Sequence, residues 1–221
     1  MYRGLLRSVV VKTAAINNED RSVSEIYQEG IRYFMREGSL NSTLKQLASD
    51  LDKHNIDYVV IGAVALLAHG YPRFTEDINL VLTTEGLDKL HRELVGLGYM
   101  PAFPGSRKRL RATASGVSVE VMVTGAYPGD GKPKPISMPN PLTEFVEIDG
   151  VHFVSLEKLI ELKLASGMTA GDRLKDLADV QELIKTRSLP SEFASLLDPY
   201  VRARFLELQQ AVEQAKETEE Q

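Results

Sequence analysis

Hydrophobic residues in the first half of the chain change from helical to strand spacing. In residues 22–37 and 43–53, apolar side chains recur every three or four positions, which predicts two amphipathic helices. The segment DYVVIG (57–62) predicts a buried strand that passes through a tight turn into a short helix. A second strand is expected at 77–82, so the region follows the order strand, turn, helix, strand.

The middle of the chain continues with a helix, two strands and a loop. Leucines at helical spacing over 87–97 predict a helix that is closed by Gly98. Strands at 109–114 and 117–123 flank a Ser-Gly pair, which is typical of a tight hairpin. Residues 124–141 are too rich in Pro and Gly for regular structure, and a loop of this length is usually functional or disordered.

The last third of the chain is predicted to be mostly helical. An Asp-Gly turn between alternating apolar residues predicts a small hairpin at 145–154. Ser155 is expected to cap a helix that runs to about residue 166, and a second helix is expected at about 172–185. The segment after Pro190 also has a helical pattern and ends in a polar, solvated tail.

These elements predict an α/β (α+β) fold, in which a mixed sheet is flanked by helices and further helices are added at both ends. We divide the chain into an N-terminal helical extension (1–42), a core (43–154) and C-terminal helices with a polar tail (155–221). The chain has 221 residues, of which 43% are hydrophobic and 26% charged, a balance that permits a substantial core.

Composition removes several classes of function. The chain has no cysteine, and its four histidines show no metal-ligand spacing, so a metal site would have to be built from carboxylates. The net charge of -5 gives no basic footprint for non-specific nucleic-acid binding. No apolar run approaches the roughly 20 residues of a membrane span, so we expect no membrane association and a cytoplasmic location.

Three polar positions fall on the predicted strands. Residues two apart on a strand share a face, so Asp77 and Asn79 point the same way. Glu120 lies opposite the valines of its own strand and needs a partner for its charge. If the two strands are neighbours, the three side chains form a cluster of oxygen ligands suited to Mg²⁺. Alternatively, Asp77 caps a turn and Glu120 faces solvent.

A lysine interrupts an apolar helix face. Lys163 falls near the centre of the arc that Leu159, Ile160 and Leu164 define. A lysine there must pair with an acid or meet a ligand phosphate. Asp176 and Asp179, three apart on the next helix, are candidate partners, so a structural ion pair and a phosphate contact both remain open.

Two basic stretches could contact an anionic substrate. Arg107, Arg109 and Arg111 would lie on one face of a strand, either steering an anion or forming a solvated edge. Lys132 and Lys134, in the long loop, invite the weaker idea of a mobile lid.

The segment VIGAVALLAHGYPRFTEDINLVL (60–82) resembles the signature of the nucleotidyltransferase superfamily, whose members have a polymerase-beta-like fold. More narrowly, the chain is similar to AbiEii-like nucleotidyltransferases of toxin–antitoxin systems and their relatives. That resemblance spans about residues 45–186. The matching positions are the Arg-x-Thr-x-Asp motif, a downstream lysine and an Asp-x-x-Asp pair: Arg73, Thr75, Asp77, Lys163, Asp176 and Asp179.

Three positions depart from the family pattern. Ala63 replaces a Gly or Ser, Asn79 replaces the second aspartate, and Glu120 stands where Asp is also common. The amide at Asn79 removes a negative charge where Mg²⁺ would bind, so affinity for a second metal should fall. Ala63 is tolerated if it takes ordinary helical angles.

The resemblance implies transfer of a nucleoside monophosphate from an NTP to a hydroxyl of an RNA, a protein or a small molecule, with weakly bound Mg²⁺ or Mn²⁺. The implied metal ligands and catalytic residues are Asp77, Asn79 and Glu120, with Lys163 also catalytic. The implied nucleotide-binding residues are Gly62, Ala63, Arg73, Thr75, Lys163, Asp176 and Asp179. The alternative is a non-catalytic module that binds nucleotide, RNA or a cognate protein partner.

Overall fold

The computed structural model describes residues 38–219. Its helices are α2 (Ser39–Lys53), α3 (Gly62–Ala68), α4 (Thr84–Glu93), α5 (Leu156–Thr169), α6 (Leu174–Arg187) and α7 (Pro199–Glu219), with a 3₁₀ helix at Ser191–Leu196. Its strands are β1 (Val59–Ile61), β2 (Asp77–Leu82), β3 (Tyr99–Pro101), β4 (Arg109–Ala112), β5 (Ser118–Val123), β6 (Val146–Ile148) and β7 (Val151–Phe153).

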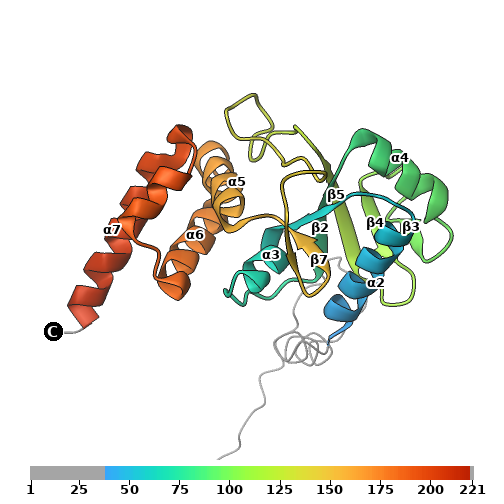
Figure 1. The fold of residues 1–221 in the computed structure, drawn as a ribbon, viewed down its shortest axis with the longest axis horizontal. Coiled ribbons are helices and arrows are strands. Elements are labelled where there is room, and N and C mark those ends of the chain that lie inside the picture. The colour runs from blue at the N-terminus through green and yellow to red at the C-terminus, as the bar shows by residue number, and fades with distance from the viewer. Residues whose placement is uncertain (1–37, 220–221) are drawn as a thin grey trace, which may run out of the picture.

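The strands form one mixed sheet of seven, in the order β3-β4-β5-β2-β1-β7-β6. The β2–β5 and β1–β7 pairs are parallel, whereas the remaining pairs are antiparallel. Helices α2 and α4 lie at the sheet end of the molecule, and α5, α6 and α7 form a helical end beside it (Figure 1). The predicted fold class, a mixed sheet flanked by helices with added C-terminal helices, is confirmed.

The centre of the sheet follows the predicted alternation of buried and polar residues. Ile78, Leu80 and Val119 have no exposed surface, and each belongs to the continuous core. The polar residues between them, on β2 and β5, are half-buried and lie on the other face of the sheet. One face of this strand pair therefore stabilises the fold, and the other face is available for chemistry.

The helical end is fixed by caps and by packing against the core. Ser155 caps α5, as predicted, because its side chain accepts a hydrogen bond from the backbone N–H of Lys158. Val201 and Phe205 of α7 are fully buried in the same hydrophobic core as the sheet. The polar C-terminal tail is part of α7 up to Glu219.

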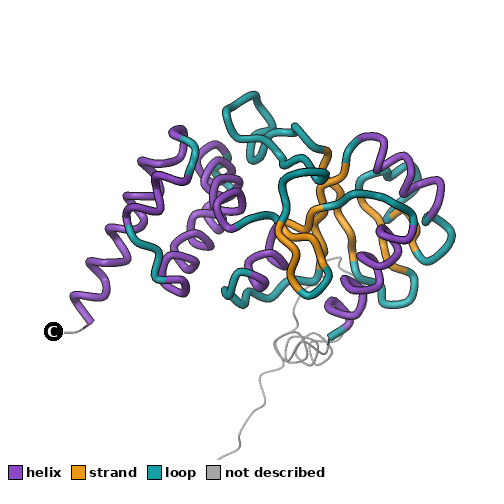
Figure 2. Tube along the Cα trace, in the orientation of Figure 1, coloured by secondary structure: helices purple, strands orange, loops and turns teal. Residues whose placement is uncertain are grey.

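The loop 124–141 contains no helix or strand, as expected, but its side chains attach it to α5 and to the hydrophobic core. Figure 2 shows it running beside α5. The Lys134 ammonium donates hydrogen bonds to Asp130, to the carbonyl of Pro128 and to Thr169 of α5, and its side chain is 5% exposed. Ile136 is buried in the core. Lys134 is thus an anchor of the loop, which does not fit the idea of a lid lysine.

Several predicted element bounds were wrong, one strand was missed, and one prediction cannot be compared. The missed strand is β3, which pairs with β4, and β4 ends at Ala112 and not at residue 114. The helix over 87–97 ends at Glu93, and Leu97 is 76% exposed because the chain turns through Gly96 and Gly98, both with positive φ. Strand β1 is shorter than the predicted 57–62, since it begins at Val59 and the helix starts at Gly62. The helix predicted at 22–37 lies outside the described residues.

Candidate functional site

The three polar strand residues are brought together, as the pattern predicted. In the parallel β2–β5 pair, Asn79 lies directly opposite Glu120, and Asp77 is two residues before Asn79 on the same face. The side-chain N–H of Asn79 donates to Asp77 Oδ2 at 3.1 Å, and the Thr75 hydroxyl donates to Asp77 Oδ1. Both oxygens of Asp77 are therefore held in fixed positions.

The turn before α3 brings backbone against this cluster. Gly62 has φ +72°, and a Cβ atom there would lie 3.1 Å from Asn79 Nδ2, so both the backbone angle and the close approach favour glycine. Ala63 follows inside α3 and has no positive φ, so it takes ordinary helical angles as the substitution requires. The extra methyl group of Ala63 is buried.

A buried ion network forms the facing wall of the site. Lys163 Nζ lies 3.0 Å from Asp176 Oδ1 and 2.7 Å from Asp179 Oδ2, and its side chain is 7% exposed. The Ser166 hydroxyl donates to Asp176 Oδ2 at 2.8 Å. Burial raises the pKa of Asp176, but the charge and hydrogen bond of Lys163, with the Ser166 hydroxyl, outweigh burial, so the pKa lies below its ordinary 3.8.

Arg73 joins this network. Its Nη1 donates to Asp179 Oδ2 at 2.8 Å, so Asp179 holds both Arg73 and Lys163. The ion pair that the sequence left as one alternative for Lys163 is present in the structure. The phosphate contact stays open, because Arg73, Lys163 and Asp176 all line the same cleft, whereas Asp179 lies behind the lining.

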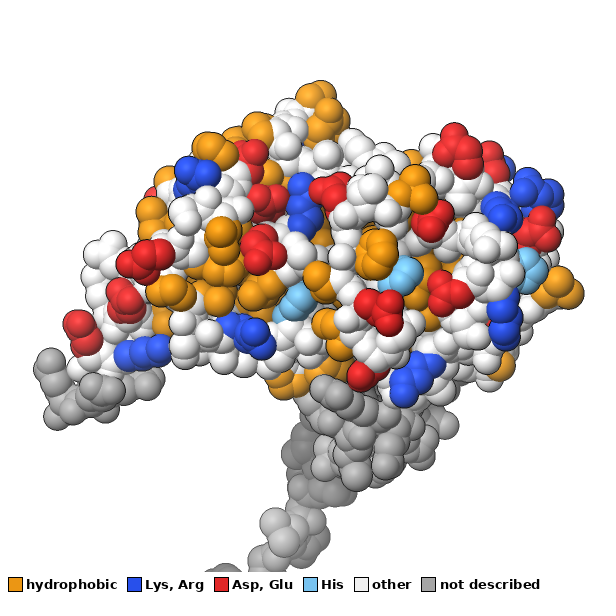
Figure 3. Space-filling view, viewed as in Figure 1, with side chains coloured by type: hydrophobic (Ala, Val, Ile, Leu, Met, Phe, Trp, Pro, Cys, Tyr) orange, Lys and Arg blue, Asp and Glu red, His pale blue; other side chains and the backbone are white. Residues whose placement is uncertain are grey.

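A cleft of about 430 Å³ separates the two walls. The predicted residues that line it are Gly62, Ala63, Arg73, Thr75, Asp77, Asn79, Glu120, Lys163 and Asp176. Figure 3 shows acidic and basic side chains close together between the helical end and the sheet end on the face in view. The cleft thus has a sheet wall with carboxylates and a helix wall with cations.

Sequence reasoning missed several lining residues. Ser166, Arg173 and Lys175 line the cleft from α5 and the start of α6, and the loop contributes Tyr127 and Gly129. Ser166 is three residues after Lys163 on one helix, so helical spacing could have found it. Arg173 and Lys175 gave no such signal, because their place depends on how α6 packs against α5.

The prediction that the three arginines of the basic run share one strand was wrong for Arg107, which lies before β4, whereas Arg109 and Arg111 are on it. Arg109 Nε donates to Glu120 Oε1 at 3.2 Å across the β4–β5 pair, in which the two residues are direct neighbours. Arg107 forms an ion pair with Asp88 on α4. None of the three arginines of the run lines the cleft, although Arg109 contacts a residue that does.

The donor set of the sheet wall fits a single hard cation. Asp77 and Glu120 supply carboxylate oxygens and Asn79 an amide oxygen, and Mg²⁺ typically binds through one or two carboxylates plus substrate phosphates. Within residues 38–219, no group of three or more acidic or histidine side chains is placed to hold a metal ion. The residues present therefore suit one Mg²⁺ or Mn²⁺ better than two.

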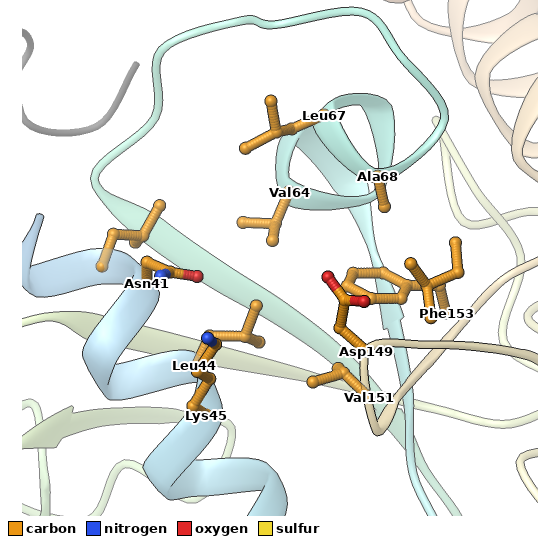
Figure 4. Close-up of a pocket in the computed structure, with 11 residues that line it drawn as sticks. Asn41, Leu44, Lys45, Val64, Leu67, Ala68, Asp149, Val151 and Phe153 are labelled. Atoms are coloured by element: carbon orange, nitrogen blue, oxygen red, sulfur yellow. The ribbon is translucent and has the colours of Figure 1, made fainter. Parts of the chain in front are cut away.

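A second, smaller pocket of about 210 Å³ is separate from this site. Leu44 and Lys45 of α2, Val64 of α3 and Phe153 of β7 are among its lining, and Asp149 points into it from the hairpin turn (Figure 4). None of the predicted site residues lines this pocket.

Comparison with known proteins places nucleotidyltransferases among the similar solved structures. No family model and no curated protein match the chain. ANT(2″)-Ia in complex with adenylyl-2″-tobramycin is 17% identical, with 74% of this chain and 95% of that chain covered and a TM-score of 0.47. A candidate nucleotidyltransferase from H. pylori is 16% identical, with 81% and 96% covered and a TM-score of 0.44.

An antigenic nucleotidyltransferase-like protein from Paracoccidioides brasiliensis is 20% identical, with 65% of this chain and 74% of that chain covered and a TM-score of 0.44. At these identities and TM-scores, the similarity assigns neither an activity nor a substrate to this chain. Among the described residues, no helix combines the length and the apolar character needed to span a bilayer.

Proposed function

We propose that the chain is a nucleotidyltransferase that moves a nucleoside monophosphate from an NTP to an acceptor hydroxyl and releases pyrophosphate. The observation that carries this proposal is the cleft, in which Asp77 and Glu120 on the sheet wall face Lys163 on the helix wall. An NTP with a bound divalent cation has the matching distribution of charge, since its phosphates are anionic and its metal is cationic.

Each wall would have its own task. Asp77 and Glu120, with Asn79 as a neutral third donor, would hold Mg²⁺ or Mn²⁺. The bound ion supplies charge that stabilises the transition state of phosphoryl transfer and aligns the acceptor oxygen. Thr75 and Asn79 keep the Asp77 carboxylate oriented through their hydrogen bonds, so the ligand needs little reorganisation.

The cationic wall would receive the triphosphate. Lys163, Arg173 and Lys175 line the cleft from α5 and the start of α6, and Arg73, which is paired with Asp179 of α6, lines it as well. Lys163 is held by two aspartates, so its position is fixed before a ligand arrives. Gly62 and Ala63 bring backbone close to the same space, and Asp176 and Asp179 would act by positioning Lys163 and Arg73 rather than by touching the nucleotide.

We also propose which type of nucleotidyltransferase the chain is. The Lys163 and Asp-x-x-Asp motifs support an AbiEii-like enzyme of the toxin–antitoxin type, which would have a cognate protein partner and act in the cytoplasm. The acceptor would be an RNA, a protein or a small molecule.

A second candidate is a nucleotidyltransferase-fold module without catalysis. It is favoured by the contacts of the two carboxylates, because Asn79 donates to Asp77 and Arg109 donates to Glu120. Both acids thus have protein partners without any metal. Such a chain would bind nucleotide, RNA or a protein and transfer nothing.

Transfer of label from α-labelled NTPs to RNA, protein and small-molecule acceptors, with Mg²⁺ or Mn²⁺, separates the two candidates. The enzyme proposal expects product from the wild type and none from Asp77→Ala, with Asp52→Ala, an exposed acid on α2, as the matched control. Product from Asn79→Asp but not from the wild type would indicate that the neutral residue at position 79 removes the transferase activity. No product from either, with retained NTP binding, would favour the binding module.

A further inference from the structure

Arg109 places a fixed positive charge beside the proposed metal site. It is the direct cross-strand neighbour of Glu120, and its Nε lies 3.2 Å from Glu120 Oε1. Asn79 is the neighbour of Glu120 on the other side. Three adjacent strands thus carry an arginine, a glutamate and an asparagine in one row across the cleft face.

The net charge of this row, taken together with Asp77, differs from that of a site with three acids. Asp77 and Glu120 contribute two negative charges, Arg109 contributes one positive charge, and Asn79 is neutral. The set has a net charge of -1, so one divalent cation brings it to +1. A second would bring it to +3 with no further acid in the row to offset it, because Asn79 is neutral. The guanidinium lies on the Glu120 side of the row, away from Asp77.

We propose that Arg109 takes the place of a second divalent cation, so that the site binds one metal ion and uses the guanidinium as its other positive charge. This inference rests on the proposed transferase function. A guanidinium is always protonated and offers five N–H donors, of which the Nε contact to Glu120 uses one. Arg109 would therefore contact an anionic phosphate or acceptor at the mouth of the cleft.

The neighbouring arginine provides the contrast. Arg107 and Arg109 are similarly exposed, at 58% and 62% of their side chains, and each pairs with one acid. The partner of Arg107 is Asp88, which is not part of the cleft lining, whereas the partner of Arg109 is a lining carboxylate. Two substitutions of the same type on one segment thus separate a site effect from a general effect of surface charge.

The test is Mn²⁺ binding to the full chain, measured by electron paramagnetic resonance of free Mn²⁺ with and without a non-hydrolysable NTP. One Mn²⁺ per wild-type chain is expected with the nucleotide. Without the nucleotide, Arg109→Gln should bind Mn²⁺ about 3- to 10-fold more tightly than the wild type, because a repelling charge is removed. Arg107→Gln should match the wild type, and Arg109→Lys, which keeps the charge, should stay close to it.

The double variant Asn79→Asp with Arg109→Gln makes the test direct. It restores a third acid and removes the fixed cation, so it should bind two Mn²⁺ ions in the presence of the nucleotide. Circular dichroism of each variant checks that the fold is retained.

Two Mn²⁺ ions per wild-type chain, or equal affinities for Arg109→Gln and Arg107→Gln, would overturn the role of Arg109. These outcomes leave the transferase proposal intact if the wild type still transfers label. A wild type that binds no Mn²⁺ even with the nucleotide, and transfers nothing, would overturn both.

Discussion

The two walls of the cleft hold their charged groups in different ways. On the helix wall, Lys163, Asp176 and Asp179 are buried and satisfy one another. On the sheet wall, Asp77 is half-buried and accepts hydrogen bonds from Thr75 and Asn79. The Glu120 side chain is 36% exposed and accepts one from Arg109. The helix wall is therefore coupled to folding, whereas the sheet wall can change its chemistry at little cost to the fold.

The physical reason is the cost of leaving a charge without a partner. A buried ion that loses its counter-ion keeps its full desolvation penalty, whereas a half-exposed carboxylate is still hydrated. Substitutions on the two walls should therefore separate into effects on unfolding free energy and effects on activity.

Replacement of Lys163 should give the largest loss of stability. Lys163→Met leaves Asp176 and Asp179 buried without their shared cation, which should cost about 3–5 kcal/mol. Urea unfolding measures this, with Lys175→Met, an exposed lysine on α6, as the matched control. If both variants lost equal stability, the coupling of the helix wall to folding would be refuted.

Substitution of Gly62 should have the next largest effect. Gly62→Ala forces a side chain into a positive φ and against Asn79, at a cost of about 1–2 kcal/mol. Gly171→Ala is the control, because a Cβ atom there would meet nothing within 4 Å and φ is not positive. Thermal unfolding compares the two, and an unchanged Gly62→Ala melting temperature would contradict the strain at this turn.

Restoring an acid at position 79 should have a smaller effect that depends on metal. Asn79→Asp replaces the hydrogen bond to Asp77 by a repulsion between carboxylates, at a cost of about 1 kcal/mol without metal. Added Mg²⁺ should recover the loss, because the new acid becomes a ligand. Melting temperatures with and without Mg²⁺ measure this, and a loss that Mg²⁺ leaves unchanged would argue against a metal site here.

The smallest effect concerns the pH dependence of stability at the link between β7 and α5. His69 Nε2 donates to the carbonyl of Val154 at 2.7 Å, just before α5. Burial has the largest effect and lowers the pKa of His69. The hydrogen bond to the carbonyl raises this pKa and the charge of Arg187 lowers it, so the pKa lies below 6.5. The unfolded chain then binds more protons, so stability is fully present above 6.5 and falls as pH drops towards the native pKa.

Urea unfolding above and below pH 6.5 should show a smaller pH dependence in His69→Gln than in the wild type. The control His54→Gln replaces a histidine at the end of α2 that is partly exposed. An equal change of unfolding free energy with pH in the wild type and both variants would exclude His69 as the source of the pH dependence.

Much of the fold could be predicted from the sequence, because its signals are local. The alternation in β2 and β5 identified both the buried residues and the face on which Asp77 and Glu120 lie, and the Asp-Gly pair marked the last hairpin. The helix after β2 was predicted too long, because spacing alone did not show that the glycines after Val95 take positive φ.

The site was only partly predictable, because half of it depends on packing between distant segments. The motif spacing identified Lys163 and its aspartates, but not that Arg73 would share Asp179 with it. The contact of Arg109 with Glu120 was also missed, because it depends on the register between β4 and β5. Arg173 and Lys175 reach the cleft only through the packing of α6 on α5.

The anchored loop has a consequence for how this chain could diverge. It starts directly after β5, which carries Glu120, and Lys134 fastens it to Thr169 on α5. A glycine at position 129 lets its backbone lie against Ser166. The segment therefore works as a spacer of fixed length between the walls. Insertions or deletions between its anchor points should change the width of the cleft while leaving the charged residues of both walls in place.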